Sequence, residues 1–163
     1  MSGRAFQLPS ELPASVLLGA AADAAGRTSR YASLGNALKA YLIVEVNQGN
    51  AATVAVTPLQ AQNSAGLNSK AINAVPIWLQ DNALVTDVLA QQTAAANFTT
   101  DALLQDKLII FEILPEAALD MANGFNHIAV QTGASNASNV TRAELVYLAA
   151  TKALGASQPT TFQ

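Results

Sequence analysis

The chain has 163 residues and no cysteine, and only 12% of its residues are charged, about half the usual share. The lack of cysteine excludes disulfides, cysteine-based zinc sites and thiol nucleophiles. The formal net charge of −3 comes from eight basic and eleven acidic residues. Because the bases are scattered and form no cluster of the kind that phosphate binding needs, we expect no nucleic-acid partner.

The low charge also bears on association between molecules. A surface built from Asn, Gln, Ser, Thr and Ala exerts little electrostatic repulsion on a neighbouring molecule, so it does little to oppose contact. The composition therefore favours a protein that works inside an assembly, and a weakly charged monomer remains open.

The length fits one domain with terminal extensions. We assign residues 1–26 to an N-terminal arm and lead-in segment, 27–154 to the domain and 155–163 to a C-terminal tail. Residues 1–15 contain two prolines and little pattern, which is typical of an extended arm. The apolar run 16–22 is too short to span a membrane, so it predicts a strand or an arm and no membrane partner.

The strongest strand pattern lies at residues 39–46. Alternation places one set on one face (Ala40, Leu42, Val44, Val46) and a second set on the other (Lys39, Tyr41, Ile43, Glu45). Turn residues follow at 47–50, and alternation returns at 53–57 before Pro58 stops it. Two alternating runs around a short loop predict a β-hairpin.

Further short strands are predicted at residues 74–79, 107–114, 126–132 and 144–149. Pro115 starts a helical turn that ends near Asn123-Gly124. Leu84, Val88 and Leu89 have helical spacing, so we expect at most a short helix between 84 and 105. Strands separated by Gly, Asn and Pro loops predict an all-β fold, a jelly-roll-like antiparallel β-sandwich with long loops and an extended N-terminal arm.

Catalytic chemistry has little support in the sequence. The single histidine, His127, alternates opposite Ile128 and should lie on a surface or interface face. The acid pairs Asp81/Asp87 and Asp101/Asp106 lack the alternating oxygens and closing Glu of a calcium loop. We therefore expect no enzyme, no catalytic residues, no cofactor and no metal.

The aromatic residues are candidates for partner contacts. Trp78, Tyr41 and Tyr147 could anchor a sugar or a protein, although Trp78 stands between two apolar neighbours and burial in the core is its default interpretation. Tyr41 and Ile43 share an outward strand face with Lys39 and Glu45. An outward Tyr and Ile beside opposite charges are typical of an interface, so these four residues form the candidate interface.

Several segments resemble a group of small head proteins of tailed bacteriophages, known as decoration, cement or minor capsid proteins. The resemblance rests on residues 39–54, 70–72 leading into 75–78, 97–100, and 124–127 followed by 133–136, and it covers roughly 27–154. It implies a β-sandwich on the outside of the capsid in the virion, made in the bacterial host cytoplasm. The implied partners are the major capsid protein and other copies of the chain, often as a trimer.

A second class of function stays open at this point. Jelly-roll sandwiches also serve as receptor- or glycan-binding modules of phage tails or fibres. Loop aromatics would favour that function, and Phe98 and Phe125 are the candidates. Both stand next to strands, where they would instead close the ends of the core.

Overall fold

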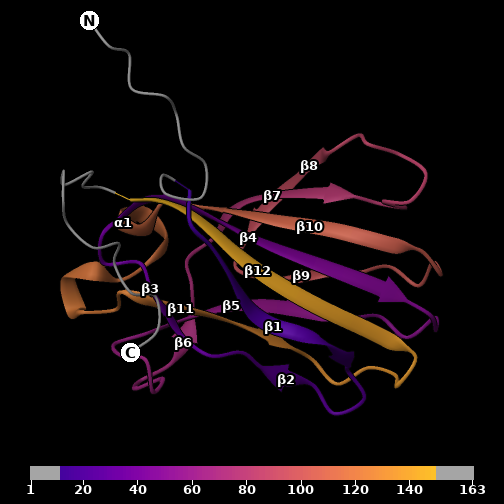
Figure 1. The fold of residues 1–163 in the computed structure, drawn as a ribbon, viewed down its shortest axis with the longest axis horizontal. Helices are drawn as coiled ribbons and strands as arrows, with labels where there is room; N and C mark the ends of the chain where they lie inside the picture. Colours follow the sequence, from indigo (N-terminus) through magenta and orange to yellow (C-terminus); the bar gives the residue numbers. More distant parts are fainter. Residues whose placement is uncertain (1–11, 150–163) are drawn as a thin grey trace, which may run out of the picture.

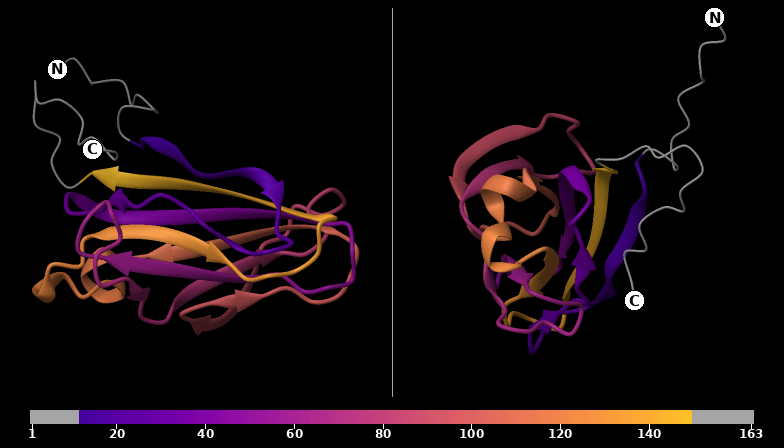
Figure 2. Two further views of the ribbon diagram at one scale, coloured as in Figure 1. Left: turned by 90° about the horizontal axis from the view of Figure 1, so that it is seen from below. Right: turned by 90° about the vertical axis from the view of Figure 1, so that its left-hand side faces the viewer.

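Two antiparallel sheets lie one above the other in the computed structural model, which describes residues 12–149 (Figures 1 and 2). The first sheet has the strand order β1 (Ala14–Ala22), β12 (Asn139–Ala149), β4 (Ala37–Gln48), β10 (Asp106–Ile113), β7 (Val75–Gln80) and β8 (Ala90–Ala95). The second has the order β2 (Arg27–Thr28), β11 (His127–Thr132), β5 (Ala55–Ala61) and β6 (Lys70–Ala71), with β3 (Ala32–Ser33) beside β11 and β9 (Phe98–Thr99) beside β5. The predicted all-β antiparallel sandwich is confirmed.

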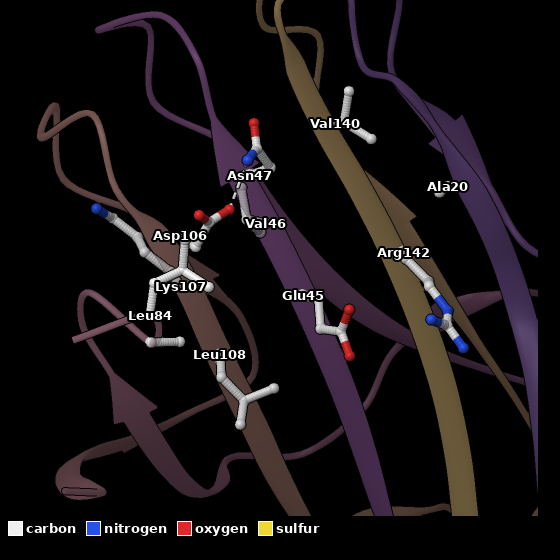
Figure 3. A pocket seen from close by; sticks show the side chains of 11 residues that line it. Ala20, Glu45, Val46, Asn47, Leu84, Asp106, Lys107, Leu108, Val140 and Arg142 are labelled. Atoms are coloured by element: carbon white, nitrogen blue, oxygen red, sulfur yellow. Dashed lines mark hydrogen bonds between the residues drawn. The ribbon is translucent and has the colours of Figure 1, made fainter. Parts of the chain in front are cut away.

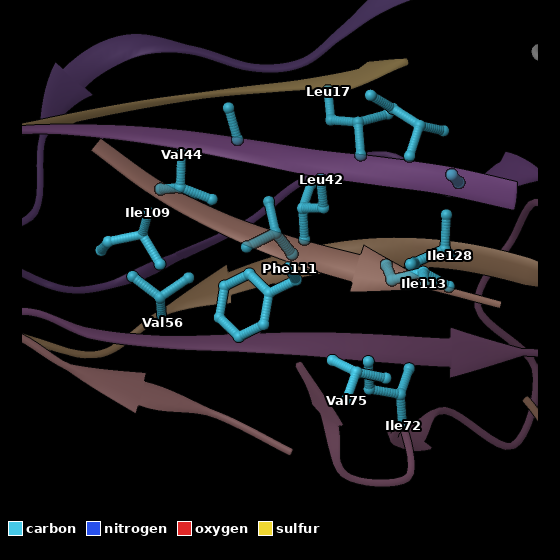
Figure 4. Packing of buried hydrophobic residues seen from close by; sticks show 14 of the residues in the cluster. Leu17, Leu42, Val44, Val56, Ile72, Val75, Ile109, Phe111, Ile113 and Ile128 are labelled. Carbon is cyan, nitrogen blue, oxygen red and sulfur yellow. The ribbon is translucent and has the colours of Figure 1, made fainter. Parts of the chain in front are cut away.

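The core lies between the sheets and consists of the inward-facing residue of each alternating pair (Figure 4). Leu42 and Val44 of β4 and Phe111 of β10 meet Val56 of β5 and Ile128 of β11, and all five side chains are fully buried. Burial of each such side chain contributes about 1.5–3 kcal/mol. The alternation predicted for 39–46 and the strand predicted at 107–114 are therefore confirmed.

The predicted hairpin between 39–46 and 53–57 is wrong. β4 pairs with β10 and β12, whereas β5 pairs with β11 in the other sheet. The connection crosses between the sheets and packs against the chain before β12. There a Cβ on Gly49 would lie 2.5 Å from the Ser138 carbonyl oxygen, and the Asn50 amide donates to Asn139 Oδ1 at 2.8 Å.

The first sheet extends to the N-terminal side of residue 27. Residues 16–22, for which the sequence leaves a strand and an arm open, belong to β1, which pairs with β12. Leu17 and Leu18 of this strand reach the core. Residues 1–11 and 150–163, which hold most of the predicted arm and the predicted tail, lie outside the described residues.

Helical structure is short. The predicted turn after Leu114 is confirmed by α1 (Pro115–Ala118) and by a 3-10 helix at Met121–Asn123, which Gly124 ends with a φ of 81°. Residues 84–105, for which at most a short helix is expected, contain no helix; they follow a turn in which Asn82 has a φ of 64° and Ala83 N donates to the Asp106 carbonyl at 2.6 Å. None of the helical segments within 12–149 has the length and hydropathy that a membrane crossing requires.

Candidate interaction face

The outward side of the first sheet carries a continuous row of apolar side chains. Alternation points every second residue of each strand away from the core. Cross-strand register places Ile43 of β4 opposite Ile110 of β10, and Ile110 opposite Trp78 of β7. Tyr41 lies opposite Val146 of β12 on the other side. We call the surface formed by Tyr41, Ile43, Trp78, Leu108, Ile110 and Val146 the outer face.

Two neighbouring hollows make the outer face concave. One, of about 420 Å³, is lined by Tyr41, Ile43, Trp78, Leu89, Ile110, Glu112 and Val146. The other, of about 460 Å³, continues along the same strands past Leu108 and Val140 (Figure 3). Its sides include Leu84 from the connection between β7 and β8 and Ala20 from β1. The floor of the outer face thus lies lower than the segments that border it.

A polar cluster stands at one end of the apolar row. Glu112 accepts a hydrogen bond from Trp78 Nε1 at 3.0 Å, and it forms an ion pair with Lys39, whose Nζ lies 2.5 Å from the carboxylate. The hydrogen bonds from Lys39 and then from Trp78 lower the pKa of the Glu112 carboxyl, and the same bond to Glu112 raises the pKa of Lys39. Lys39 Nζ also lies 5.2 Å from the centre of the Tyr41 ring.

Of the remaining charges of the outer face, Glu45 and Arg142 line the second hollow. Arg142 and Glu144 of β12 form an ion pair. Glu45 stands between Arg142 and Leu108 in the register and is exposed, and it forms no ion pair within residues 12–149. In the register Glu144 lies opposite Ile43 and Glu112 lies opposite Tyr41, so charges stand directly beside the apolar side chains of the outer face.

All four candidate interface residues lie where the alternation predicts, on the outward side of β4, and Tyr41, Ile43 and Lys39 are half-buried there. The default placement of Trp78 in the core is wrong, because its neighbour Ile77 points inward and Trp78 points outward. Tyr147, by contrast, is buried and presents no surface to a partner; burial raises the pKa of its phenol.

Sequence reasoning did not assign Ile110 and Val146 to this surface. Ile110 lies on a strand with two largely apolar rows, so the pattern alone does not say which row faces the core, whereas Val146 shares its row with the charged Arg142 and Glu144. The strand register with β4 is what brings them beside Ile43 and Tyr41.

The acidic residues form a pair that the sequence spacing did not indicate. Asp81 and Asp101 both approach the buried Lys107 ammonium, at 3.1 and 2.9 Å, whereas Asp87 does not join them and Asp106 instead accepts from Asn47 Nδ2 at 2.6 Å. This arrangement neutralises a buried base. Among residues 12–149, no group of three or more His, Cys, Asp or Glu side chains has the geometry of a metal site.

His127 and the two candidate loop aromatics, Phe98 and Phe125, are at least partly buried by other parts of the fold. His127 is half-buried, with Nδ1 2.6 Å from Asn126 Oδ1, and burial lowers its pKa. Phe125 is buried beneath Lys70, whose Nζ lies 4.0 Å from the ring centre, and Phe98 packs against the core. Phe98 thus packs against the core as expected, whereas Phe125 is buried outside the core cluster.

Comparison with known proteins identifies no family for this chain. No protein-family model matches the sequence, and no curated protein matches it. Among solved structures, the SPBc2 prophage-derived protein YomS is similar with a TM-score of 0.46 and 10% sequence identity, over 83% of this chain and 92% of that chain. We draw no conclusion about function from so distant a likeness.

Proposed function

We propose that this chain is a structural virion protein, a capsid decoration or cement (minor capsid) protein that binds the outside of a phage head and stabilises it. The observation that carries the proposal is the apolar, concave outer face. An antiparallel sheet with one side in water normally has polar residues on that side. Here Tyr41, Ile43 and Ile110 occupy outward positions, and a surface of this kind on a soluble domain marks an interaction site.

Two features of the sequence support the same function. The low share of charged residues leaves little repulsion between the outer face and a neutral partner. The resemblance of residues 39–54 and of the later segments to phage head proteins gives the class of assembly. We propose that the partners are the major capsid protein and further copies of this chain as a trimer, with the protein located at the capsid surface and having no enzymatic activity.

The chemistry of the outer face fits a large protein surface. Its centre holds aromatic and branched aliphatic side chains, which supply most of the binding energy of interfaces when they are fully desolvated. The Lys39–Glu112 and Arg142–Glu144 pairs stand beside these side chains, and paired charges at an interface orient a partner more than they add affinity.

The test of shell binding is co-sedimentation of the purified protein with shells assembled from the major capsid protein of the same phage. The double variant Tyr41→Lys/Ile43→Lys should lose binding, because it places two charges at the centre of the contact. Thr28→Lys/Gln131→Lys is the matched control, since this exposed cross-strand pair lies on the second sheet. Normal co-sedimentation of the first variant would exclude the outer face as the docking surface.

The proposed self-association is measured separately, as the absolute mass in solution by light scattering at several concentrations. A mass three times that of the chain supports the trimer. A mass equal to that of one chain at every concentration contradicts the trimer and leaves shell binding to the sedimentation test.

The position of Trp78 favours one second candidate, a receptor- or glycan-binding module of a phage tail or fibre. Trp78 and Tyr41 line the same hollow with the Glu112 carboxylate, and aromatic faces beside an acceptor suit sugars. A titration with glycans of the host surface, followed by fluorescence of this only tryptophan, tests it. Saturable quenching together with failure to bind shells would replace the first proposal with this one.

A further inference from the structure

Six large aliphatic side chains are exposed together in two neighbouring loops, at the end of the sandwich where β7 and β8 connect and β10 begins (Figure 1). We call them the loop patch: Leu84, Val85, Val88 and Leu89 from the connection between β7 and β8, and Leu103 and Leu104 from the connection between β9 and β10. Single exposed apolar residues are normal on a protein surface, whereas a group of this size marks an interaction site.

The two loops are held in place by one buried residue. Lys107 Nζ pairs with Asp81 in the first loop and with Asp101 in the second, and it donates to the Leu103 carbonyl at 3.0 Å. A surface that is fixed before binding loses less conformational entropy when it is covered. The loop patch is therefore ready to accept a segment without first becoming ordered.

The smaller hollow of the outer face, which we call the first hollow, leads from β1 to the loop patch. Val146 of β12 lines one side of it, and Leu89 of the loop patch lines the other. Ala14 pairs with Val146, and Tyr147 N donates to the Pro13 carbonyl at 3.3 Å. The segment that precedes Pro13 therefore leaves the sheet beside the first hollow.

The segment before β1 is long enough to cross this hollow. Gln80 donates a hydrogen bond to the Thr86 carbonyl and lies level with Glu45 of β4. Ala14 lies level with Tyr41, so these points are four residues apart along β4, about 13 Å, and four strand spacings apart across the sheet, about 19 Å. The diagonal is about 23 Å. The ten residues from position 4 to Ala14 span up to about 33–36 Å.

The chemistry of residues 1–11 matches the loop patch. In an extended segment Arg4, Phe6 and Leu8 fall on one side, so a base and two apolar side chains are presented together. Asp87 lies within the loop patch, is exposed, and forms no ion pair among the described residues. An apolar segment with one base is the complement of an apolar patch with one unpaired acid.

The C-terminal segment does not fit in the same way. Ala149 lies level with Ala37, which is eight residues, or about 26 Å, from the level of Glu45 along β4. The only base of residues 150–163 is Lys152, which follows three residues later and reaches about 10 Å. This base therefore stays too far from the loop patch to pair with an acid there.

We propose that residues 1–11 of the same molecule lie across the first hollow and cover the loop patch, with Arg4 paired to Asp87. A second copy carries the same segment, but a short tether gives the molecule's own segment an effective concentration of about a millimolar, far above that of a dilute protein. The segment competes with the shell for the outer face and keeps the apolar side chains covered until the shell displaces it. This regulation rests on the proposed function, whereas the contact itself does not.

The contact is tested with one nitroxide spin label on Gln7→Cys in the full chain, which has no other cysteine. Gln7 alternates with Phe6 and Leu8, so the label points away from the contact. Amide NMR signals of residues 81–89 should broaden, and dilution should not change the broadening. In a mixture of spin-labelled chain and unlabelled, isotope-enriched chain, the signals of the enriched chain should stay sharp. Broadening in the mixture would make a second copy the occupant and overturn the proposal, as would sharp signals at 81–89 in the labelled chain.

Charge exchange in the labelled chain tests the pairing. Arg4→Glu and Asp87→Arg should each shift the equilibrium roughly two- to fivefold toward the uncovered patch, as for an exposed charge pair, and so reduce the broadening. The variant with both changes should regain it. Arg4→Glu/Glu116→Arg is the matched control and should not, since Glu116 is exposed on α1, at the other end of β10. Broadening that is insensitive to these charges, or that the control variant restores, would overturn the pairing.

Co-sedimentation with shells separates this inference from the proposed function. Arg4→Glu should strengthen shell binding by the same factor by which it uncovers the patch, because the segment and the shell compete. Wild-type protein that shows the broadening and binds no shells would remove the proposed function and leave the contact standing. Protein that binds shells without the broadening would do the reverse. Unchanged shell affinity of Arg4→Glu together with reduced broadening would overturn the regulation.

Discussion

Asp23 and Arg27 form an ion pair that ties the two sheets together at one edge of the sandwich. The Asp23 carboxylate is fully buried and accepts from Arg27 Nε at 3.0 Å, from Thr132 Oγ1 of the second sheet at 2.8 Å, and from Thr141 Oγ1 of the first. The Arg27 guanidinium donates in turn to the Gly19 carbonyl of β1 at 2.8 Å. A buried carboxylate is tolerated here because both of its oxygens accept hydrogen bonds and Arg27 supplies the opposite charge.

Removing this carboxylate should strongly destabilise the fold. Asp23→Ala removes the counter-charge of Arg27 and leaves Arg27 Nε and two buried hydroxyl groups without this acceptor, and the expected loss in the free energy of unfolding is about 3–5 kcal/mol. Urea unfolding at neutral pH measures it. Asp87→Ala, at an exposed position, is the matched control and should change stability by no more than about 0.5 kcal/mol. Equal effects of the two substitutions would contradict the role given to Asp23.

Lys107 should act locally. Lys107→Met keeps the length of the buried side chain but removes the charge that Asp81 and Asp101 share, and both acids are partly exposed, so water can solvate them. We expect a modest loss of about 1–2 kcal/mol. Amide hydrogen exchange should rise at residues 81–89 and 100–105 and stay unchanged in β4. An increase in hydrogen exchange that is equal across the whole sandwich would show that Lys107 does not order these loops.

Glu112 should report its own titration through Trp78. The lowered pKa of the Glu112 carboxyl means that its contribution to stability is present above the ordinary value of 4.5 and is lost as the pH falls through the lowered value. Because Lys39 and Glu112 are both partly exposed, this contribution is about 1 kcal/mol at most. Trp78 fluorescence in the folded protein should therefore change with a midpoint below 4.5.

Variants at the same cluster test the direction in which this fluorescence midpoint shifts. Lys39→Met removes the largest cause of the lowered pKa, so the midpoint should move upward, and Glu112→Gln should abolish the transition. The raised pKa of Lys39 has the opposite pH dependence: its contribution is present below 10.5 and is lost as the pH rises through the raised value. A midpoint that Lys39→Met does not move would contradict the ion pair.

His127 should remain neutral at pH 7. Burial lowers its pKa below the ordinary value of 6.5, so the unfolded chain binds a proton more readily than the folded one. Stability is then complete above pH 6.5 and decreases as the pH falls from there through the lowered value. Proton NMR of the imidazole measures the midpoint directly, and His127→Gln should flatten the stability profile below pH 6.5. A midpoint at or above 6.5 would contradict this expectation.

The sequence by itself determined the local structure and the direction of side chains along most strands. Alternation in residues 39–46 separates Leu42 and Val44 from Tyr41 and Ile43, because a strand points successive side chains to opposite sides whatever its partner is. Pro115 and Gly124 likewise mark the helical turn through backbone constraints that act within a few residues.

Only the tertiary structure decided which strands pair and which apolar row is buried. β4 and β5 are neighbours in the chain yet lie in different sheets, because burying their two inward rows against each other removes more apolar surface from water than pairing them side by side. Trp78 and Ile110 face outward because of that pairing, and Lys107 joins Asp81 to Asp101 across 20 residues of sequence. These contacts depend on register between distant segments, which no local pattern in the chain encodes.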